Sequence, residues 1–174
     1  QFVTDEPDLI VDESLRLHGK LLEGFGGNPQ ASKAAFSGSK GVKHVALSLN
    51  GEPITYPRIN EMLTRFNKEG LSTFMVTNAQ YPEQIRQLGP VTQLYISVDA
   101  PSKELLKEVD RPLFPDYWER FLASMDALAQ KKERTCVRIT VIKGLNDVDE
   151  EAYARHITRA NPDFIEVKGY MHVG

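Results

Sequence analysis

Cysteine is nearly absent from this sequence, which has a single one, Cys136, in 174 residues. One thiol cannot form a disulfide within the chain, and it cannot supply the ligands of a cysteine-rich metal site. Cys136 lies among β-branched residues, so we expect a small, buried, apolar side chain there. We therefore assign no metal ligand to any residue of this chain.

Long apolar runs and an excess of positive charge are also lacking. No stretch approaches the roughly 20 residues of a membrane span, and no signal peptide is visible, so we expect a cytoplasmic protein. The formal net charge of −3 excludes bulk attraction to nucleic acid, so such a partner would need local basic patches. The chain starts at Gln1 rather than Met, and we expect both ends to be cut.

What the sequence does contain is a regular alternation of strand and helix patterns. Runs of β-branched and aromatic residues predict strands at 43–49, 71–77, 92–98, 135–142 and 163–168. Apolar residues at helical spacing predict helices at 57–69, 82–88, 101–109, 115–131 and 149–160. Before them, residues 1–41 predict one helix followed by an irregular Gly- and Ser-rich connection. Residues 42–174 carry the β/α units.

Strict alternation predicts an α/β fold with a parallel sheet and right-handed crossovers. Helices cover both faces of a doubly wound sheet, so its strands should be apolar on both faces. These strands instead alternate, as where Ile139 and Val141 flank Thr140. We therefore predict a single domain, 1–174, that forms a partial TIM-like (β/α) barrel of about five parallel strands.

The alternation also predicts which side chains face the barrel lumen and which face the helices. The set expected in the lumen is small or polar: Ala46, Ser48, Thr77, Ser97, Arg138, Thr140, Glu166 and Lys168. The set expected against the helices is apolar: Val45, Leu47, Phe74, Val76, Ile96, Val98, Ile139, Val141, Ile165 and Val167. A polar lumen suits a bound ligand. Arg138 and Glu166 could equally be a structural ion pair.

Polar segments follow each predicted strand at once. They are Asn50-Gly51-Glu52-Pro53, Asn78-Ala79-Gln80, Asp99-Ala100-Pro101, Lys143-Gly144-Leu145-Asn146 and Lys168-Gly169-Tyr170. Turns need Gly, Asn, Asp and Pro, so each segment alone has a purely structural interpretation. The carboxyl ends of barrel strands converge on one site, however, so five such segments together indicate a functional site.

The first of these turns is the most informative. Gly51 lets the backbone pass close to a ligand, Glu52 offers a carboxylate to an ammonium group, and Pro53 stiffens the turn. The turn follows a strand end and precedes a helix. It resembles the Gly-Gly-Glu-Pro motif of the radical S-adenosylmethionine superfamily, in which the motif binds the methionine amino group. Asn50 stands where that motif has its first Gly.

Longer segments resemble one family of that superfamily, the 4-demethylwyosine synthases of the wybutosine pathway. The segments are VTNAQ at 76–80, PVTQLYISVDA at 90–100, DRPLF at 110–114 and PDFIEVKG at 162–169. The resemblance runs in order from about His44 to Gly169.

The resemblance implies formation of 4-demethylwyosine from N1-methylguanosine-37 of tRNA-Phe and pyruvate. It implies S-adenosylmethionine and [4Fe-4S] clusters, one of which activates S-adenosylmethionine reductively to a 5′-deoxyadenosyl radical. Eukaryotic members often carry an additional FMN-binding, flavodoxin-like domain. The family's cluster cysteines and its pyruvate lysine lie outside the matching region. We therefore expect the 174 residues alone to be inactive.

Within the predicted lumen, the strand ends then receive individual roles. Asn50, Gly51, Glu52 and Asn78 are expected at the methionine end of the cofactor. Ser97 and Asp99 are expected at the ribose, because a carboxylate accepts readily from sugar hydroxyls. Asp99 could instead cap the helix that follows it. The remaining assignments are Arg138 and Asn146 to the carboxylate or adenine side, and Glu166 and Lys168 to the substrate side.

Two other functional classes stay open. A non-radical barrel lyase or aldolase would form a Schiff base on Lys168, which is the one candidate catalytic residue. The alternative for this lysine is a simple ion pair with Glu166. A catalytically inactive RNA-binding domain would use a basic rim. That rim would comprise Arg111, Lys131, Lys132, Arg134 and Lys143, although solvated surface charge also explains the 131–134 run.

Overall fold

The computed structural model describes residues 3–171, and its centre is one parallel sheet of five strands. The strands are β1 (His44–Leu47), β2 (Ser72–Thr77), β3 (Gln93–Ser97), β4 (Arg134–Val141) and β5 (Phe164–Gly169). Each strand pairs with its neighbours in sequence, in the order β1-β2-β3-β4-β5. A doubly wound sheet reverses its strand order at a switch point, and the described strands show no reversal. The predicted five-stranded partial barrel is therefore confirmed.

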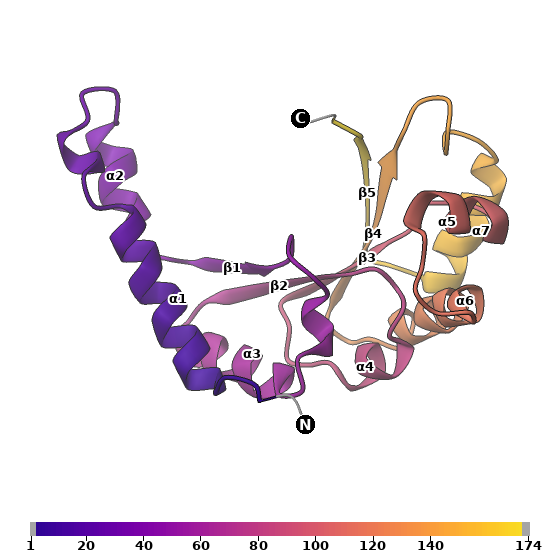
Figure 1. Ribbon diagram of the computed structural model, residues 1–174, viewed down its shortest axis with the longest axis horizontal. Coiled ribbons are helices and arrows are strands. Elements are labelled where there is room, and N and C mark those ends of the chain that lie inside the picture. Colours follow the sequence, from indigo (N-terminus) through magenta and orange to yellow (C-terminus); the bar gives the residue numbers. More distant parts are fainter. Residues whose placement is uncertain (1–2, 172–174) are drawn as a thin grey trace.

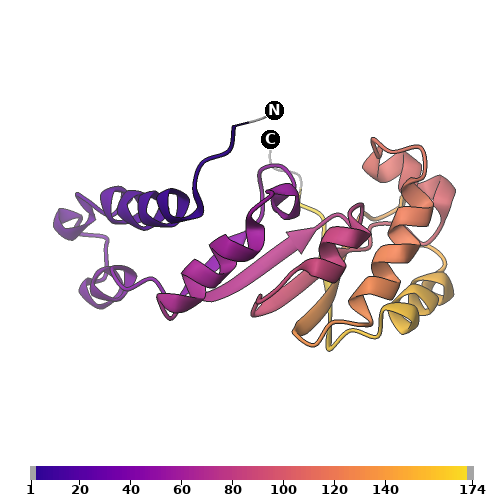
Figure 2. The same cartoon turned by 90° about the horizontal axis from the view of Figure 1, so that it is seen from below.

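The helices between the strands cover one side of this sheet. They are α3 (Ile59–Lys68), α4 (Pro82–Gln87), α5 (Lys103–Asp110), α6 (Tyr117–Leu128) and α7 (Glu150–Ala160). Figure 2 shows α3, α4, α6 and α7 in a row across that face. In Figure 1 the opposite, concave side carries no helix of the described chain. This one-sided cover leaves the concave face free for a site.

The hydrophobic core lies between the sheet and the helices. Every second residue of the central strands is buried there, as Leu94 and Ile96 of β3 and Val137 of β4 show. Helix α3 contributes residues at helical spacing, Met62, Leu63 and Phe66, and α6 contributes Phe121, Met125 and Leu128. Because each fully buried apolar side chain stabilises the fold by about 1.5–3 kcal/mol, these two patterns fix which face of each element points inward.

The strand register confirms most of the predicted lumen set. Ser97 pairs with Arg138, and Arg138 pairs with Glu166. Thr140 pairs with Lys168, and Ala46 pairs with Phe74 on the same concave face. Paired residues of neighbouring strands project from the same face of a sheet. A row of polar side chains therefore crosses the concave face from β3 to β5.

The predicted faces of β2 are wrong. Thr73, Met75 and Thr77 point toward the helices and are buried, whereas Phe74 and Val76 lie on the concave face. Thr73 can be buried because its hydroxyl accepts from Thr92 N at 3.2 Å and donates to Asn67 Oδ1 at 3.4 Å. A satisfied hydroxyl costs little in a core. Polarity alone therefore gave the wrong side for this strand.

The predicted helix-facing side of β5 is confirmed by the register, but its helix cover is incomplete in the described residues. Ile165 and Val167 project from the helix side of the sheet, but they are 53% and 63% exposed. β5 is the last strand of the sheet and pairs only with β4. No described helix follows it, so these two side chains are left largely uncovered, although Val167 lines a cavity with Tyr153 and Ile157 of α7.

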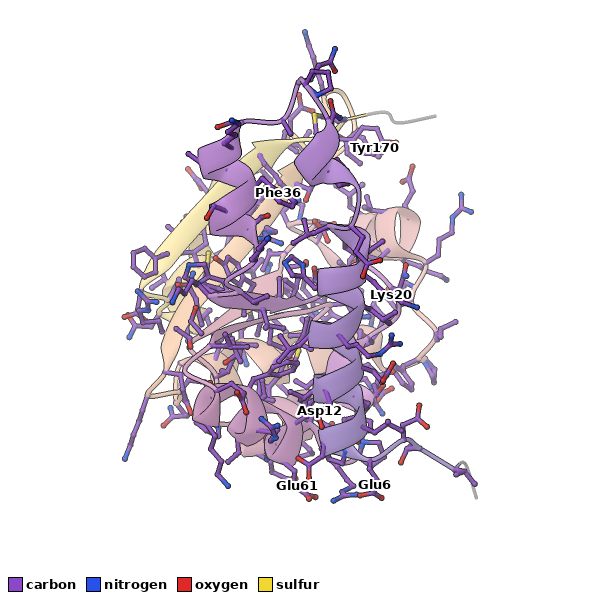
Figure 3. The ribbon with its side chains drawn as sticks, turned by 90° about the vertical axis from the view of Figure 1, so that its left-hand side faces the viewer. Glu6, Asp12, Lys20, Phe36, Glu61 and Tyr170 are labelled. Carbon is purple, nitrogen blue, oxygen red and sulfur yellow. The ribbon has the colours of Figure 1, made fainter. Side chains whose placement is uncertain are left out.

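The N-terminal arm holds a helix that the sequence did not predict. It comprises α1 (Pro7–Leu21), η1 (Phe25–Gly27) and α2 (Lys33–Ser39), and α2 lies within the segment expected to be irregular. Ser32 caps α2 by accepting a hydrogen bond from Ala35 N at 3.4 Å. Figure 3 shows Phe36 on α2, at the far end of the arm from Glu6. The Phe36 ring packs so closely on Gly26 that a Cβ there would lie 3.0 Å from it.

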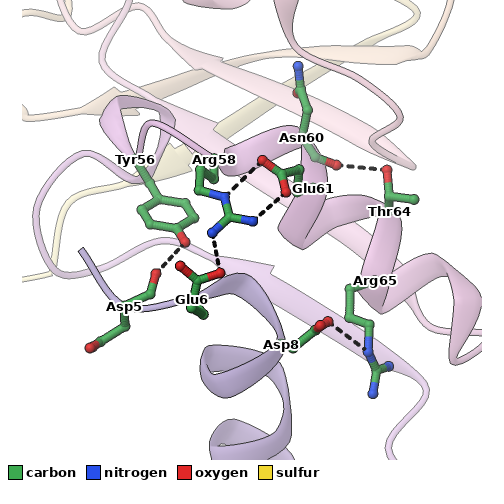
Figure 4. Close-up of polar contacts among 9 residues, drawn as sticks. All are labelled: Asp5, Glu6, Asp8, Tyr56, Arg58, Asn60, Glu61, Thr64 and Arg65. Atoms are coloured by element: carbon green, nitrogen blue, oxygen red, sulfur yellow. Dashed lines mark hydrogen bonds and ion pairs between the residues drawn. The ribbon is translucent and has the colours of Figure 1, made fainter. Parts of the chain in front are cut away.

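Polar contacts join α1 to α3 (Figure 4). Arg58 donates to both oxygens of Glu61 and to Glu6, Arg65 lies 3.3 Å from Asp8, and the Tyr56 hydroxyl donates to the Asp5 carbonyl at 2.7 Å. Such exposed pairs contribute little to stability. The apolar anchor of α1 is Val11, which is fully buried. In residues 3–171, no helix is both long and apolar enough to cross a membrane.

Candidate functional site

A pocket of about 320 Å³ opens at the carboxyl ends of β2 and β3. Its lining includes Asn78, Ser97 and Asp99, three of the residues that the sequence assigned to a cofactor. The other walls come from the segments that follow β2 and α5: Gln80, Tyr81, Asp110, Arg111, Pro112, Leu113 and Phe114. A hollow of about 380 Å³ beside α1 and α3 holds none of the predicted residues, and within it Arg58 pairs with Glu61 and Arg65 with Asp8. We therefore take the strand-end pocket as the candidate site.

Glu52 lies next to this pocket and is partly buried. Its Oε2 accepts a hydrogen bond from Asn78 N at 2.9 Å, whereas its buried Oε1 has no partner among the described residues. Burial raises the pKa of Glu52, and the Asn78 N–H and the Thr77 hydroxyl partly offset that rise. The carboxylate caps neither η2 (Pro53–Thr55) nor α3. One oxygen is thus anchored. The other is influenced by the Thr77 hydroxyl but makes no hydrogen bond of normal geometry among the described residues, so it can accept from a ligand that donates a proton or carries positive charge.

The turn that carries Glu52 has an unusual backbone. Gly51 has φ +68°, a conformation that suits glycine, and a Cβ added there would meet nothing within 4 Å. Leu49 also has positive φ, 80°, and its side chain is 98% exposed. Leucine rarely takes this conformation, and such strain is often found at binding sites. Asn50 is exposed on the same turn.

Asp99 and Asn146 are held together at the ends of β3 and β4. Asn146 is buried, and its Nδ2 donates to the Asp99 and Thr140 carbonyls, each at 2.8 Å. Its Oδ1 accepts from Ile142 N at 2.6 Å. Both amide protons are therefore committed within the protein. These contacts favour a positioning role for Asn146, which fixes the backbone that carries Asp99.

Arg138 and Glu166 form the ion pair considered from the sequence, with Nη2 3.1 Å from Oε2. The Arg138 guanidinium also lies over the Tyr95 ring, 4.5 Å from its centroid. Its Nε is buried and has no partner among the described residues. A donor therefore remains on the concave face, so the pair and a ligand contact are compatible.

The Asp99 carboxyl faces these charged groups from the neighbouring strand. Burial raises the pKa of Asp99, while the Thr140 N–H and the charges of Lys168 and Arg138 act in the opposite direction. Lys168 lies on the concave face of β5 and is exposed. A Schiff-base lysine is usually activated in a desolvated, apolar site. The surroundings of Lys168 do not supply one in the described chain.

Asp110 is a site residue that sequence reasoning missed. It is the last residue of α5 and lines the same pocket as Asp99. Although the residue as a whole is exposed, desolvation of its carboxyl, together with the charge of Asp99, raises the pKa of Asp110 from 3.8 to about 7. The DRPLF segment was noted only for its resemblance to a family. Since α5 is amphipathic and Asp110 sits at its end, periodicity gave no reason to place this carboxyl in a site.

The raised pKa of Asp110 predicts a pH-dependent change in stability. An acid whose pKa is raised by folding makes a stabilising contribution that is fully present when the pH is below its pKa in the unfolded chain. This contribution is lost as the pH rises through its pKa in the folded chain, which is about 7. We expect Asp110→Asn, which cannot ionise, to be more stable than the parent at pH 8 and nearly equal to it at pH 4. Urea unfolding of the variant and the parent at pH 4 and pH 8 measures this difference in stability. An equal stability difference at both pH values would contradict the prediction.

The basic rim predicted for an RNA-binding domain is not formed. Lys131, Lys132 and Arg134 lie before or at the start of β4, whereas Lys143 follows its end. The eight residues of β4 separate these groups by about 25 Å. Lys131 is moreover committed to the Leu88 carbonyl and to Glu133. The set therefore offers no single continuous surface.

The described residues offer no group of three or more His, Cys, Asp or Glu side chains placed to hold a metal ion. Cys136 is buried, and burial raises the pKa of its thiol. Iron–sulfur clusters are held mainly by several thiolates. With one cysteine in the sequence, and that one buried, the described residues do not fit such a cluster.

Comparison with known families and structures identifies relatives over nearly all of the chain. The "Radical SAM superfamily" matches residues 31–157, and "Wyosine base formation" matches residues 159–174. The S-adenosyl-L-methionine-dependent tRNA 4-demethylwyosine synthase TYW1 of Mus musculus is 49% identical over 170 residues, 98% of this chain. The synthase of Arabidopsis thaliana is 45% identical over all 174 residues.

Two solved structures resemble the fold closely. A structure of TYW1 with a lysine-pyruvate adduct bound has a TM-score of 0.87 and 38% identity, covering 97% of this chain and 56% of the other. A crystal structure of archaeal TYW1 has a TM-score of 0.85 and 36% identity, covering 98% and 59%. The chain spans about a quarter of the curated relatives, 24% of the mouse protein and 27% of the Arabidopsis protein.

Proposed function

The chain belongs to the radical SAM superfamily, and from this membership we propose that it is the S-adenosylmethionine-binding part of a tRNA 4-demethylwyosine synthase. The reaction would join pyruvate carbons to N1-methylguanosine-37 of tRNA-Phe, in the cytoplasm. The observation that carries the proposal is the strand-end pocket beside Glu52, in a chain 49% identical to the mouse synthase.

The residues present fit S-adenosylmethionine at its polar ends. The unpartnered Glu52 Oε1 suits an ammonium group, and the open space beside Gly51 admits a ligand close to the backbone. Ser97 and Asp99 offer a hydroxyl and a carboxylate at the neighbouring strand ends, where a ribose would lie. The unpartnered Nε of Arg138 suits a carboxylate or a ring nitrogen. Asn50 and Asn78 would complete the methionine end.

When bound, S-adenosylmethionine together with an iron–sulfur cluster would supply the radical chemistry that acts on the methylated guanosine. The cluster ligands cannot come from this chain, and any FMN would serve as an electron carrier elsewhere. The role of the residues described here is to bind and orient. Glu52 and Asp99 fix the two ends of the cofactor, Asn146 holds the Asp99 backbone, and Glu166 with Lys168 faces the substrate side.

A chimera tests the function directly. The 174 residues would replace the equivalent segment of the mouse synthase, which would supply everything outside it. We expect the purified, cluster-loaded chimera to convert N1-methylguanosine in tRNA-Phe to 4-demethylwyosine when pyruvate and S-adenosylmethionine are present, as measured by mass spectrometry of digested tRNA. A chimera that carries its cluster and cleaves S-adenosylmethionine but leaves the tRNA unchanged would refute the proposal.

The Schiff-base aldolase alternative predicts a different result. In that mechanism Lys168 would be trapped by pyruvate and borohydride in the chain itself, adding mass to a peptide that contains Lys168. We expect no such adduct, because Lys168 is exposed on the edge strand and lies beside polar groups. Substitution Lys168→Arg would serve as the control.

A further inference from the structure

Asn50 differs from the other six asparagines of the sequence in the residue that follows it. It precedes Gly51 and forms the only Asn-Gly step in the chain. Asn28 and Asn161 precede proline, which has no backbone N–H. The following residue matters because its backbone nitrogen can attack the side-chain amide of asparagine, and a Cβ on that residue hinders the approach. Asn50 thus has the least hindered neighbour of all the asparagines.

The turn after β1 leaves both reacting groups of this step open. Asn50 and Gly51 are exposed, and a Cβ at Gly51 would meet nothing within 4 Å. In residues 3–171 the Asn50 side chain makes no hydrogen bond, and the Gly51 N–H has no acceptor there either. The Asn50 N–H donates to the Ser48 carbonyl at 3.2 Å, a bond that involves neither reacting group. The side-chain amide and the following nitrogen are therefore free to meet.

Asn78 occupies a similar position but is protected. It is also exposed, it follows β2 directly, and it precedes a residue with positive φ, Ala79 at 63°. Its Oδ1 accepts from Gln80 N at 3.1 Å, however, and Ala79 is fully buried. Hydrogen bonds to the backbone also hold the side chains of Asn60, Asn67 and Asn146. Asn78 is therefore the internal reference for the reactivity of Asn50.

We propose that Asn50 is a site of spontaneous deamidation, a covalent modification that detaches Glu52 from Asn78. The Gly51 nitrogen loses its proton and bonds to Asn50 Cγ, the Cγ–Nδ2 bond breaks, and the amide nitrogen leaves as ammonia with that proton. Water then opens the cyclic imide. Opening at Cγ gives aspartate, and opening at the backbone carbonyl gives isoaspartate, in which the chain runs through Cβ. The sequence of steps involves no oxidation or reduction.

Isoaspartate lengthens the backbone just before Glu52. The Glu52 carboxylate accepts from Asn78 N at 2.9 Å, which joins the turns after β1 and β2. Only Gly51 separates Asn50 from Glu52, and η2 begins directly afterwards at Pro53. The added carbon–carbon bond, about 1.5 Å long, must therefore be absorbed within this turn, and we expect the contact with Asn78 to be lost. The inference goes beyond the proposed function, because it concerns the turn whatever ligand the site binds.

Incubation in mildly alkaline buffer without ligand tests the modification, in the 174-residue chain and in the chimera with the mouse synthase. Mass spectrometry of peptides follows the replacement of the amide NH2 by OH at each asparagine over time. We expect Asn50 to react at least about tenfold faster than Asn78, which corresponds to about 1.4 kcal/mol of activation free energy. Gly51→Ala, which places a Cβ beside the attacking nitrogen, should remove most of this difference.

The same reaction in urea separates an open turn from an unfolded chain. We expect Asn50 to react at nearly the same rate in the native and the urea-unfolded chain, because the native turn leaves its reacting groups free. Asn78 should react faster once unfolded, because the Gln80 contact is then lost. Circular dichroism checks native helix content during the native incubation. A rate at Asn50 that falls more than about tenfold on folding, or that does not exceed the rate at Asn78, would overturn the modification site.

Hydrogen exchange at the Asn78 amide tests the loss of Glu52, because this N–H donates to the Glu52 carboxylate. Chromatography separates the isoaspartate form from the parent, and NMR measures the exchange. We expect the Asn78 amide of the isoaspartate form to exchange about ten- to a hundredfold faster, the ratio that one hydrogen bond to a charged group supplies. Asn50→Asp, with the new charge on an ordinary backbone, is the matched control and should keep the parent rate. Equal exchange in the isoaspartate form and the parent would overturn the detachment of Glu52.

The outcomes separate this inference from the proposed function. The tRNA reaction is measured on freshly prepared chimera, and deamidation is measured on incubated protein. A fresh chimera that forms no product, with deamidation at Asn50 as expected, would refute the function and leave the modification site standing. An active chimera in which Asn50 is no more reactive than Asn78 would overturn the modification site and leave the function standing.

Discussion

Asn146→Ala is expected to lower the free energy of unfolding by about 2–5 kcal/mol, because it removes three buried hydrogen bonds at once. The Asp99 and Thr140 carbonyls and the Ile142 N–H would be left without partners. An unsatisfied buried group costs about 1–3 kcal/mol, and water entering the space left by the amide recovers part of that cost. Urea unfolding followed by circular dichroism measures the change.

An exposed asparagine provides the matched control for this substitution. Asn28 accepts one hydrogen bond, from Gln30 N at 2.9 Å, in the N-terminal arm. We expect Asn28→Ala to cost less than about 1 kcal/mol. If Asn146→Ala cost no more than Asn28→Ala, the buried amide would not hold the strand ends together. In the chimera, Asn146→Ala should also weaken binding of S-adenosylmethionine, since the Asp99 backbone would lose its fixed position.

The central part of the sheet could be predicted from the sequence because polarity and burial agree there. In β4, Val137 and Ile139 are buried against helices, while Arg138 and Thr140 face the concave side. The alternation of a strand has a period of two, so one correct assignment fixes the rest of that strand. The same pattern placed the segments after β2 and β3 at one edge, where they line the pocket.

β2 could not be assigned in this way, because its more polar face is the buried one. Phe74 and Val76 read as core residues, but Phe74 lies on the concave face between the rings of His44 and Tyr95, at centroid distances of 6.1 and 6.5 Å. The buried face instead takes Met75 and two threonines. The contacts of Thr73 with Asn67 and Thr92 help to make that choice favourable, and these are tertiary contacts.

The candidate site was likewise predicted only in part. Residues directly after a strand could be found by position, but Asp110 reaches the pocket from the end of a helix, 11 residues after Asp99. The amide of Asn146 was expected to face a ligand and is instead committed to three backbone groups. A sequence shows which side chains follow a strand. Whether their polar atoms are free depends on loop geometry.

Glu52→Gln is expected to lower the affinity of the chimera for S-adenosylmethionine by about ten- to a hundredfold, because it removes one charge-assisted hydrogen bond worth about 1.5–3 kcal/mol. The unpartnered Oε1 is the atom that would meet the ammonium group. The glutamine oxygen can still accept from Asn78 N, so the anchor of the side chain is retained. Affinity for tRNA should be nearly unchanged, since phosphate contacts dominate such binding.

The stability of the same variant separates a ligand role from a structural one. Folding raises the pKa of Glu52, so ionisation of this carboxyl destabilises the native state as the pH rises through the folded pKa. A glutamine cannot ionise, so Glu52→Gln removes that cost at pH 7. We therefore expect the melting temperature to stay equal or rise slightly. Glu61→Gln, on the exposed face of α3, is the control that should leave cofactor affinity unchanged. If Glu52 served only to support Asn78, calorimetry and thermal melts would show the reverse: unchanged cofactor affinity with a lowered melting temperature.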